Sequence, residues 1–292
     1  MLKEIKKAIE RIEELSKTKP IRIISHFDTD GITSASIFSR AMERWNKKFS
    51  LQVVKSLDED FIKSLPENHI LIFLDLGSGS LDYLKEKNTE IFIFDHHEII
   101  QDIPQNVTMI NPLLTKEDPL SGAAICYLFA KSLSPKNKDL AYLSVIGMVG
   151  DSLEKNLSKI YDEILKDSET IIKRGLLIYP STRPLDKVFE YSSTPYIPGV
   201  TGSYTGTLDL LREANIPKID GRFKALYELK DEEMSNLITA VMLKCLGDKK
   251  SQELIGNIYL IKFFNKLEDA RELSALINAC SRMEYPSVCL GL

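Results

Sequence analysis

The stretch IRIISHFDTDG (residues 21–31) decides the fold, because an apolar run passes directly into His and Asp side chains. The same arrangement recurs in HILIFLDLGSG (69–79) and in EIFIFDHHE (90–98). Short runs of β-branched and aromatic residues without polar alternation are typical of strands buried on both faces of a parallel sheet. The sequence therefore predicts three such strands, each ending in a polar cluster.

The sequence around these runs continues the pattern. LQVVKSL (51–57) fits a further strand, and apolar residues at helical spacing lie between the strands. Helices are expected at residues 2–16, 32–46, 80–87, 121–133 and 138–149. We predict an α/β fold with a mainly parallel sheet flanked by helices.

A change in composition near residue 180 marks a second part of the chain. Prolines punctuate IYPSTRPLDKVFEYSSTPYIPGVTGS (178–203), which is typical of a connecting segment. We expect one domain over 1–180, a linker over 181–203, and a helical segment with the start of a second α/β domain over 204–292. Within the last range we expect helices at 204–215, 231–247 and 269–280, a strand and turn at 257–266, and the opening of another strand in YPSVCLGL (285–292).

The polar clusters should meet in space, because ligands of open α/β sheets bind beyond the carboxyl ends of the strands. The side chains concerned are His26, Asp28, Asp30, Asp75, Asp95, His96 and His97. Taken singly, Asp28 or Asp30 would cap the helix that starts after Gly31, and each His would be polar surface. Taken together, the carboxylates would repel one another strongly without a cation. The sequence therefore favours a divalent metal site.

Two metal ions roughly 3.5–4 Å apart can clamp the attacking and leaving oxygens of a phosphoryl transfer. One carboxylate must bridge such a pair, and Asp75 stands alone at the end of a central strand. Asp151 is a further candidate ligand, because it follows the apolar stretch YLSVIGMVG (142–150), in which Gly147 and Gly150 allow close approach of the backbone. Its alternative role is the N-cap of the next helix. Mixed His and Asp ligands suit manganese, zinc or iron, whereas purely carboxylate sites lean to magnesium or calcium.

The composition excludes several classes of protein. The 292-residue chain has a net charge of −4, which argues against an overall basic coat for nucleic acid and leaves room for a local basic groove. No apolar run approaches the roughly 18–20 residues that span a bilayer, so no membrane partner is expected. Four cysteines without CxxC spacing indicate buried thiols in a reducing, cytoplasmic compartment.

The motifs HFDTDG, LDLGSG, DHHE and GMVGD resemble, in this order, the four motifs of the DHH phosphoesterases. The segments NPLL (111–114), SGAA (121–124), 183–202 and DARELSALINACSRM (269–283) resemble the archaeal RecJ-like exonuclease branch of that family. The resemblance implies two Mn²⁺ ions, with Mg²⁺ as the alternative. It also implies hydrolysis of single-stranded DNA or RNA by attack of a metal-bound hydroxide.

The resemblance also implies a role for each site residue. His26, Asp28 and Asp75 would hold one ion, and the second would be held by Asp30, Asp75, His96 and Asp151. His97 would donate to the scissile phosphate, and Asp95 would orient the neighbouring histidines. The sequence contains no Gly-rich motif of the second family domain, DHHA1, so residues 204–292 would hold only the start of that domain. The two explanations are a truncated chain and a natural chain that has lost the domain.

The substrate-binding residues are less constrained by the sequence. Ser121 and Gly122 precede a helix, so their amides are candidates for a substrate phosphate, with a plain N-cap as the alternative. Arg183 is a candidate phosphate contact within a loose set of basic residues and tyrosines, a combination that suits single strands. The alternative is a solvated basic face beside tyrosines that pack the linker.

Three functions follow from these observations. The first is a RecJ-like manganese exonuclease acting on single-stranded nucleic acid in repair or replication. The second is a phosphodiesterase or phosphatase for small substrates, namely oligoribonucleotides of a few residues, phosphoadenosine phosphate or cyclic dinucleotides. The third is a replisome component with partners of the GINS type, a role that the resemblance implies for this branch. The complete set of candidate ligands disfavours a role without catalysis.

Overall fold

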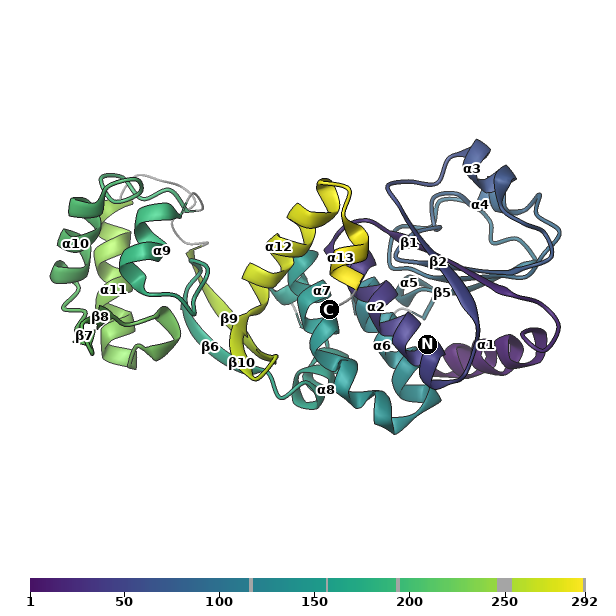
Figure 1. Ribbon diagram of the computed structural model, residues 1–292, viewed down its shortest axis with the longest axis horizontal. Coiled ribbons are helices and arrows are strands. Elements are labelled where there is room, and N and C mark those ends of the chain that lie inside the picture. Colours follow the sequence, from purple (N-terminus) through teal and green to yellow (C-terminus); the bar gives the residue numbers. More distant parts are fainter. Residues whose placement is uncertain (116–117, 156, 193–194, 246–253, 291–292) are drawn as a thin grey trace. The chain divides into compact units, whose positions relative to one another are not determined.

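The computed structural model describes all residues except 116–117, 156, 193–194, 246–253 and 291–292. Its described residues fall into two compact units (Figure 1). The first unit comprises Met1–Glu169 with Ser274–Leu292, and the second comprises Thr170–Leu273. The division differs from the expected boundaries at residues 180 and 203.

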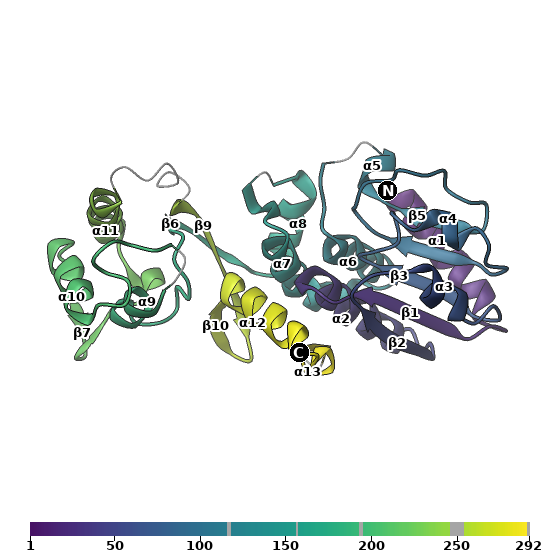
Figure 2. The same cartoon turned by 90° about the horizontal axis from the view of Figure 1, so that it is seen from above.

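A parallel sheet with the strand order β2-β1-β3-β4-β5 forms the first unit, as far as the structure describes it (Figure 2). Its strands are β1 (Ile21–His26), β2 (Phe49–Val54), β3 (Ile70–Leu74), β4 (Ile91–Phe94) and β5 (Val107–Ile110). Every residue of β3 and β4 is buried, in agreement with the predicted strands buried on both faces. The predicted α/β fold with a mainly parallel sheet is therefore confirmed.

Helices cover both faces of this sheet. On one face, Ile62 of α3 (Glu59–Ser64) and Leu81 of α4 (Leu81–Leu84) join a core with Phe73 and Ile93. On the other face, Phe38 of α2 (Thr29–Arg44) and Phe129 of α6 (Gly122–Leu133) pack against Phe94, and their ring centroids lie 5.2 and 5.1 Å from that of Phe94. The sheet is thus the middle layer of three, which exposes only its ends to ligands.

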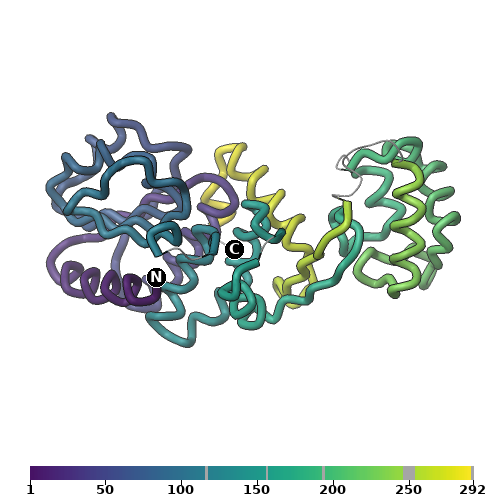
Figure 3. The backbone as a smooth tube through the Cα atoms, turned by 180° about the vertical axis from the view of Figure 1, so that it is seen from behind, coloured from purple at the N-terminus to yellow at the C-terminus, as the bar shows by residue number. Residues whose placement is uncertain are grey.

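The remaining helices of the first unit surround this layered core. They are α1 (Leu2–Leu15), α5 (Pro112–Thr115), η1 (Pro135–Leu140), α7 (Ala141–Gly150), η2 (Leu153–Lys155), α8 (Lys159–Asp167), the part of α12 (Ala270–Arg282) from Ser274 on, and α13 (Pro286–Leu290). Figure 3 follows the backbone from the purple α1 to the yellow α12 and α13. The first unit therefore contains both ends of the described chain.

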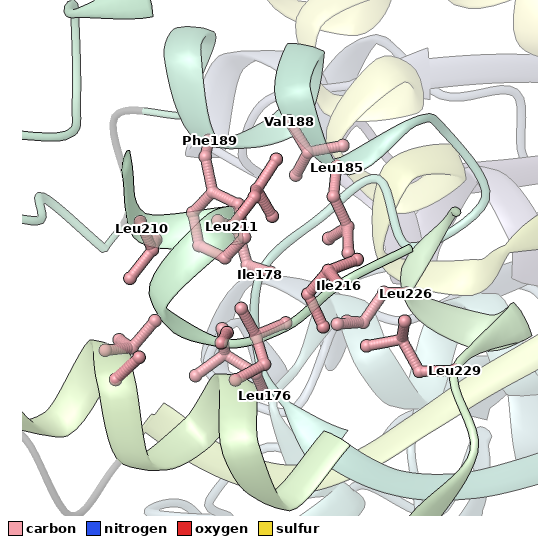
Figure 4. Close-up of a cluster of buried hydrophobic side chains, with 14 of the residues drawn as sticks. Leu176, Ile178, Leu185, Val188, Phe189, Leu210, Leu211, Ile216, Leu226 and Leu229 are labelled. Atoms are coloured by element: carbon pink, nitrogen blue, oxygen red, sulfur yellow. The ribbon is translucent and has the colours of Figure 1, made fainter. Parts of the chain in front are cut away.

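The second unit combines an antiparallel sheet with helices. The sheet has the order β10-β9-β6 and consists of β6 (Ile171–Leu176), β9 (Ile255–Phe263) and β10 (Lys266–Asp269). The other elements are α9 (Leu185–Tyr191), α10 (Tyr204–Glu213), β7 (Lys218–Ile219), β8 (Arg222–Phe223), η3 (Leu226–Glu228) and α11 (Asp231–Lys244). Leu176, Phe189, Leu211 and Leu226 share one buried apolar cluster (Figure 4).

Two expectations for the second half differ from the structure. The segment 181–203 contains α9 and contributes Leu185, Val188 and Ile197 to the core of the second unit, so it is part of that unit and not a linker. Residues 286–290 form the short helix α13, so a strand is wrong there, and residues 291–292 of that segment lie outside the described residues. Within the described chain, no helix is both long and apolar enough to cross a membrane.

Candidate metal centre

Asp75 lies in the middle of the candidate site, directly after strand β3. Its backbone N–H still donates to Phe94 O at 2.8 Å, and its φ of +60° lies in the left-handed region. Few residues other than glycine adopt this region, although Asp tolerates it better than most. Its side chain is 1% exposed. The turn after β3 thus places a buried carboxylate at the carboxyl end of the central strand.

His26 and Asp28 lie beside Asp75 on one side. His26 ends β1, and its Nδ1 is 2.9 Å from Asp28 Oδ2 and 3.6 Å from Asp75 Oδ2. Asp28 is also the N-cap of α2, since its Oδ1 accepts the N–H of Gly31 at 2.9 Å. The capping interpretation of Asp28 is therefore correct, and it leaves the second carboxylate oxygen for His26.

His96 joins three carboxylates on the other side. Its Nε2 lies 3.0 Å from Asp151 Oδ2, 3.3 Å from Asp75 Oδ1 and 3.8 Å from Asp30 Oδ2. Asp151 directly follows α7, while the N-cap of α8 is Ser158. Asp151 is thus the C-cap of α7, and it is not the N-cap of α8.

These side chains form overlapping groups that are suited to hold a cation. In each group, one candidate ligand atom per residue lies within 4.8 Å of the others. The groups are His26, Asp28 and Asp75; Asp30, Asp75, His96 and Asp151; and Asp75, Asp95, His96 and His97. The first two contain the same residues as the two ligand sets expected from the sequence. Asp75 belongs to both, as a bridging ligand must.

The polar atoms of the site suit a cation. Among the described residues, His26 Nδ1, His96 Nε2 and both carboxylate oxygens of Asp75 are buried without a hydrogen-bond partner, because their close contacts lack hydrogen-bond geometry. Buried polar atoms are nearly always paired, and an unpaired one costs about 1–3 kcal/mol. A divalent cation among these atoms would satisfy all of them, and mixed nitrogen and carboxylate ligands suit Mn²⁺.

The carboxylates carry an electrostatic cost that a cation would remove. Burial, together with the charges of Asp75 and Asp151, raises the pKa of Asp30 well above its usual range. Burial also raises the pKa of Asp75. A raised carboxyl pKa means that the protein disfavours the negative charge in that place. The site therefore concentrates negative charge that a bound cation would offset.

The same carboxylates raise the pKa of two histidines, which favours the positively charged form of each imidazole. Burial alone would lower the pKa of His26, but the carboxylates of Asp28 and Asp75 raise it to about 10. Burial likewise opposes the charged form of His96, and Asp151 and Asp75 raise its pKa to about 11. Both imidazoles thus lie where the protein favours a positive charge.

His97 belongs to a separate hydrogen-bonded group that leads away from the ligands. Its Nδ1 lies 2.7 Å from Asp95 Oδ1, which raises the pKa of His97. The other oxygen of Asp95 accepts the N–H of Ser78 at 2.9 Å. Asn111 donates to His97 O at 2.9 Å and to Ser78 Oγ at 3.3 Å. Sequence reasoning missed the roles of Ser78 and Asn111, although Asn111 opens the motif NPLL.

Two glycines let the helices come close to the carboxylates. A Cβ on Gly147 of α7 would lie 2.4 Å from Asp30 Oδ1, and a Cβ on Gly122 of α6 would lie 2.8 Å from Asp75 Cβ. Both distances are shorter than van der Waals contact, so no larger residue fits without a shift of backbone. The predicted role of Gly147 in close backbone approach is confirmed, and Gly122 has the same role.

The predicted contact of Ser121 and Gly122 with a substrate phosphate conflicts with the structure. The N–H of Ser121 donates to Tyr161 Oη at 2.8 Å, and the N–H of Gly122 donates to Asp30 Oδ2. Ser121 Oγ accepts the N–H of Ala124 as a plain N-cap. The start of α6 thus orients the carboxylate of Asp30, because the helix dipole and free N–H groups attract any nearby anion.

Arg183 lies in the second unit, before α9. Its guanidinium is 3.4 Å from Glu272 Oε1, and its side chain is 57% exposed. A weak pair of this kind leaves the guanidinium accessible to a phosphate. The substrate contact of Arg183 stays a prediction, because the second unit does not contain the candidate ligands.

Two protein families match the chain. Residues 20–148 match the DHH family, N-terminal domain, and residues 178–258 match the DHH-CID domain. The first match contains all the candidate ligands except Asp151, and the second contains the whole segment expected to be a linker.

Relatives with similar sequences share these regions. An uncharacterized protein of Methanocaldococcus jannaschii is 29% identical over 308 residues, which cover 100% of this chain and 68% of the relative. The single-stranded-DNA-specific exonuclease RecJ of Bacillus subtilis is 24% identical over 169 residues, which cover 51% of this chain and 21% of that exonuclease. The chain thus matches only a small part of the length of the bacterial exonuclease.

Solved structures share the fold. CDC45 from Entamoeba histolytica has a TM-score of 0.69 at 13% identity, covering 100% of this chain and 68% of CDC45. RecJ in complex with Mn²⁺ from Thermus thermophilus has a TM-score of 0.50 at 16% identity, covering 96% of this chain and 38% of RecJ. Together with the domain matches, these similarities show that residues 20–148 are a DHH-family N-terminal domain, that residues 178–258 are a DHH-CID domain, and that the chain has a RecJ-like fold.

Proposed function

We propose that this protein is a metal-dependent phosphodiesterase that cleaves single-stranded nucleic acid. The observation that carries the proposal is the pair of candidate ligand groups that share the buried carboxylate of Asp75. A carboxylate shared by two divalent cations would allow them to bind the attacking and the leaving oxygen of a phosphoryl transfer. The DHH-family N-terminal domain and the similarity to the RecJ exonucleases support the same class of reaction.

His26, Asp28 and Asp75 would hold one cation, and Asp30, Asp75, His96 and Asp151 would hold the other. Bound divalent ions supply a water molecule of lowered pKa and neutralise charge on the phosphate. Each set includes an imidazole, which makes Mn²⁺ a better match than Mg²⁺. Neighbouring groups keep the carboxylates in place, since Asp28 accepts from Gly31 and Asp30 accepts from Gly122.

His97 would act on the substrate. Its imidazole is 55% exposed, unlike the candidate ligands His26 and His96, which are 22% and 17% exposed. Asp95 binds Nδ1 and favours the protonated ring, so Nε2 carries a proton that can be donated to a phosphate oxygen. Such a donor stabilises the negative charge that grows on the phosphate during cleavage.

The substrate class comes from the relatives. RecJ of Bacillus subtilis is named as specific for single-stranded DNA, and the exposed Arg183 of this chain offers a phosphate contact.

We place the activity in the cytoplasm, because the four cysteines form no disulfide in the described chain.

The test is digestion of single-stranded DNA and RNA labelled at the 5′ or 3′ end, in Mn²⁺ and in EDTA. We expect stepwise cleavage in Mn²⁺, no cleavage in EDTA, and loss of cleavage in Asp75→Ala. The labelled end also reports the polarity. Absence of polymer cleavage, with hydrolysis of bis-nitrophenyl phosphate or short oligoribonucleotides, would instead support the small-substrate alternative.

A role in a replication complex is the second candidate. Its support is the fold similarity to CDC45 over the whole chain. We propose GINS-type proteins as partners in that case, and co-purification tests them. Catalysis and assembly are compatible, and the complete ligand groups favour catalysis as the primary function.

A further inference from the structure

Helix α12 holds the loop that carries two of the candidate ligands. Thr29, between Asp28 and Asp30, donates its N–H to Asn278 Oδ1 at 3.0 Å and its Oγ1–H to Ser274 O at 2.8 Å. One residue before the pair, Phe27 O accepts a hydrogen bond from Ser281 Oγ. These contacts join residues that are about 250 positions apart in the sequence, all within the first unit.

The contacts come from one face of α12. Ser274, Asn278 and Ser281 recur at spacings of four and three residues, which places them on the same side of a helix. Ser274 and Ser281 are 5% and 3% exposed, whereas Leu276 on another side is 54% exposed. This face therefore packs on the loop after β1, and its polar groups satisfy polar groups of that loop.

Asn278 supplies a hydrogen-bond acceptor for a free N–H group at the start of α2. The first N–H groups of a helix have no partner within the helix. Asp28 accepts one of them, from Gly31, and Asn278 accepts that of Thr29. The carboxamide of Asn278 thereby fixes the peptide bond that follows Asp28 directly.

The same face of α12 lies against the end of α7. A Cβ on Gly150 would be 3.0 Å from Thr29 Cβ and 3.4 Å from Ser274 Oγ. Gly150 immediately precedes the candidate ligand Asp151. The loop after β1 and the end of α7 thus pack together beside α12, and both carry ligands.

We propose that Asn278 is a positioning residue of the metal centre, which holds the Asp28–Thr29 peptide so that Asp28 and Asp30 stay in ligand geometry. The inference rests on the proposed metal-dependent function and adds a residue that touches neither cation nor substrate. Partners that orient metal ligands commonly change metal affinity about 10–100-fold.

The test is calorimetric titration of Mn²⁺ into the full chain, with the melting temperature measured in EDTA. Asn278→Leu keeps the volume of the side chain and removes the acceptor, and we expect it to weaken Mn²⁺ binding about 10-fold. Asn278→Asp keeps an acceptor and should bind Mn²⁺ within about threefold of the wild type. Leu276→Ala, on the exposed side of α12, is the matched control and should leave Mn²⁺ binding unchanged.

Three outcomes would overturn the inference. If Asn278→Leu binds Mn²⁺ like the wild type, the contact is only structural, whatever happens to the melting temperature in EDTA. If Asn278→Asp is as weak as Asn278→Leu, the acceptor is not what matters. If the wild type binds no Mn²⁺, the proposed metal centre itself fails, and this result is distinct from the other two.

Discussion

At the scale of single residues, Asp95 has two possible roles, as a metal ligand or as the residue that orients His97. It belongs to one of the candidate ligand groups, together with Asp75, His96 and His97. Its oxygens, however, already accept the N–H groups of Ser78 and His96 at 2.9 and 2.8 Å, and one lies 2.7 Å from His97 Nδ1. These contacts lower the pKa of Asp95 and leave little room for a cation. We therefore assign it the orientation of His97.

Asp95→Asn distinguishes orientation from ligation. The carboxamide can still accept from Ser78, but it no longer favours protonated His97. We expect two bound Mn²⁺ ions, as in the wild type, and a fall in phosphodiester hydrolysis of about 10²–10⁴-fold. Mn²⁺ titration and rate measurement on the same preparation check this, with Asp102→Asn at an exposed position as the control. Loss of one bound ion would make Asp95 a ligand.

Gly147→Ala tests the close approach of α7. The new methyl group would lie 2.4 Å from Asp30 Oδ1 and 2.6 Å from Ala123 Cβ, so α7 and the attached Asp151 must shift. Overpacking of this kind costs about 1–3 kcal/mol, and we expect Mn²⁺ affinity to fall at least about 10-fold. Gly79→Ala is the control, since no atom lies within 4 Å of its added Cβ. Equal Mn²⁺ affinities of the two variants would contradict the proposed packing.

The candidate ligands could be predicted from the sequence because they directly follow apolar runs or elements that end at the site. The residues that hydrogen-bond to them and to their neighbours could not be predicted. Apolar runs that end in Asp or His indicate which residues meet at the sheet edge. Asn111 and Ser78 act through a contact across two loops, and no local pattern encodes it. Ser121 and Gly122 have the sequence of an anion-binding helix start, but the anion is the protein's own Asp30.

At the scale of elements, the turn η3 in the second unit depends on one carboxylate. Glu228 pairs with Arg222 and accepts the N–H of Ala225 at 2.7 Å. Arg222 and this N–H lower the pKa of Glu228 from 4.5 to about 2. A group whose pKa is lower in the folded state stabilises that state at any pH above its unfolded value, and the contribution is lost as the pH falls through the folded value.

Glu228→Gln should therefore lower the melting temperature of the second unit by a few degrees at pH 7. The difference from the wild type should shrink as the pH falls from about 4.5 towards 2. Calorimetry of both proteins between about pH 3 and pH 7 checks this. A difference that stays constant over that range would mean that the charge of Glu228 contributes nothing.

Short elements were the hardest to predict. β5 has only four residues, Val107–Ile110, and directly follows a polar loop, so the sequence alone does not identify it as a strand. α13 has the apolar composition of a strand, but Pro286 at its first position fixes a helical φ, and the thiol of Cys289 donates to Ile277 O. α9 lies among prolines, and its burial in the second unit becomes visible only when Phe189 and Val188 meet the distant Leu211.

At the scale of the whole molecule, the first unit is built from two separate parts of the chain. Met1–Glu169 supplies all the candidate ligands, and Ser274–Leu292 returns after the second unit to hold the loop after β1. Helical periodicity predicts that 269–280 is helical, but it does not indicate which residues the polar face of this helix contacts. The sequence therefore predicted the sheet and the candidate ligands that meet at its edge, whereas the return of residues 274–290 to the first unit is known only from the structure.

The most direct test of the central claim is the number of Mn²⁺ ions bound by the wild type and by Asp75→Asn, measured by calorimetric titration. Asp75 is the residue that both candidate ligand groups share, so its replacement should weaken both sites at once. We predict two ions for the wild type, and at least about 100-fold weaker binding at both sites for Asp75→Asn. A wild type without bound Mn²⁺, or an Asp75→Asn variant that binds two ions with unchanged affinity, would contradict a two-cation centre bridged by Asp75.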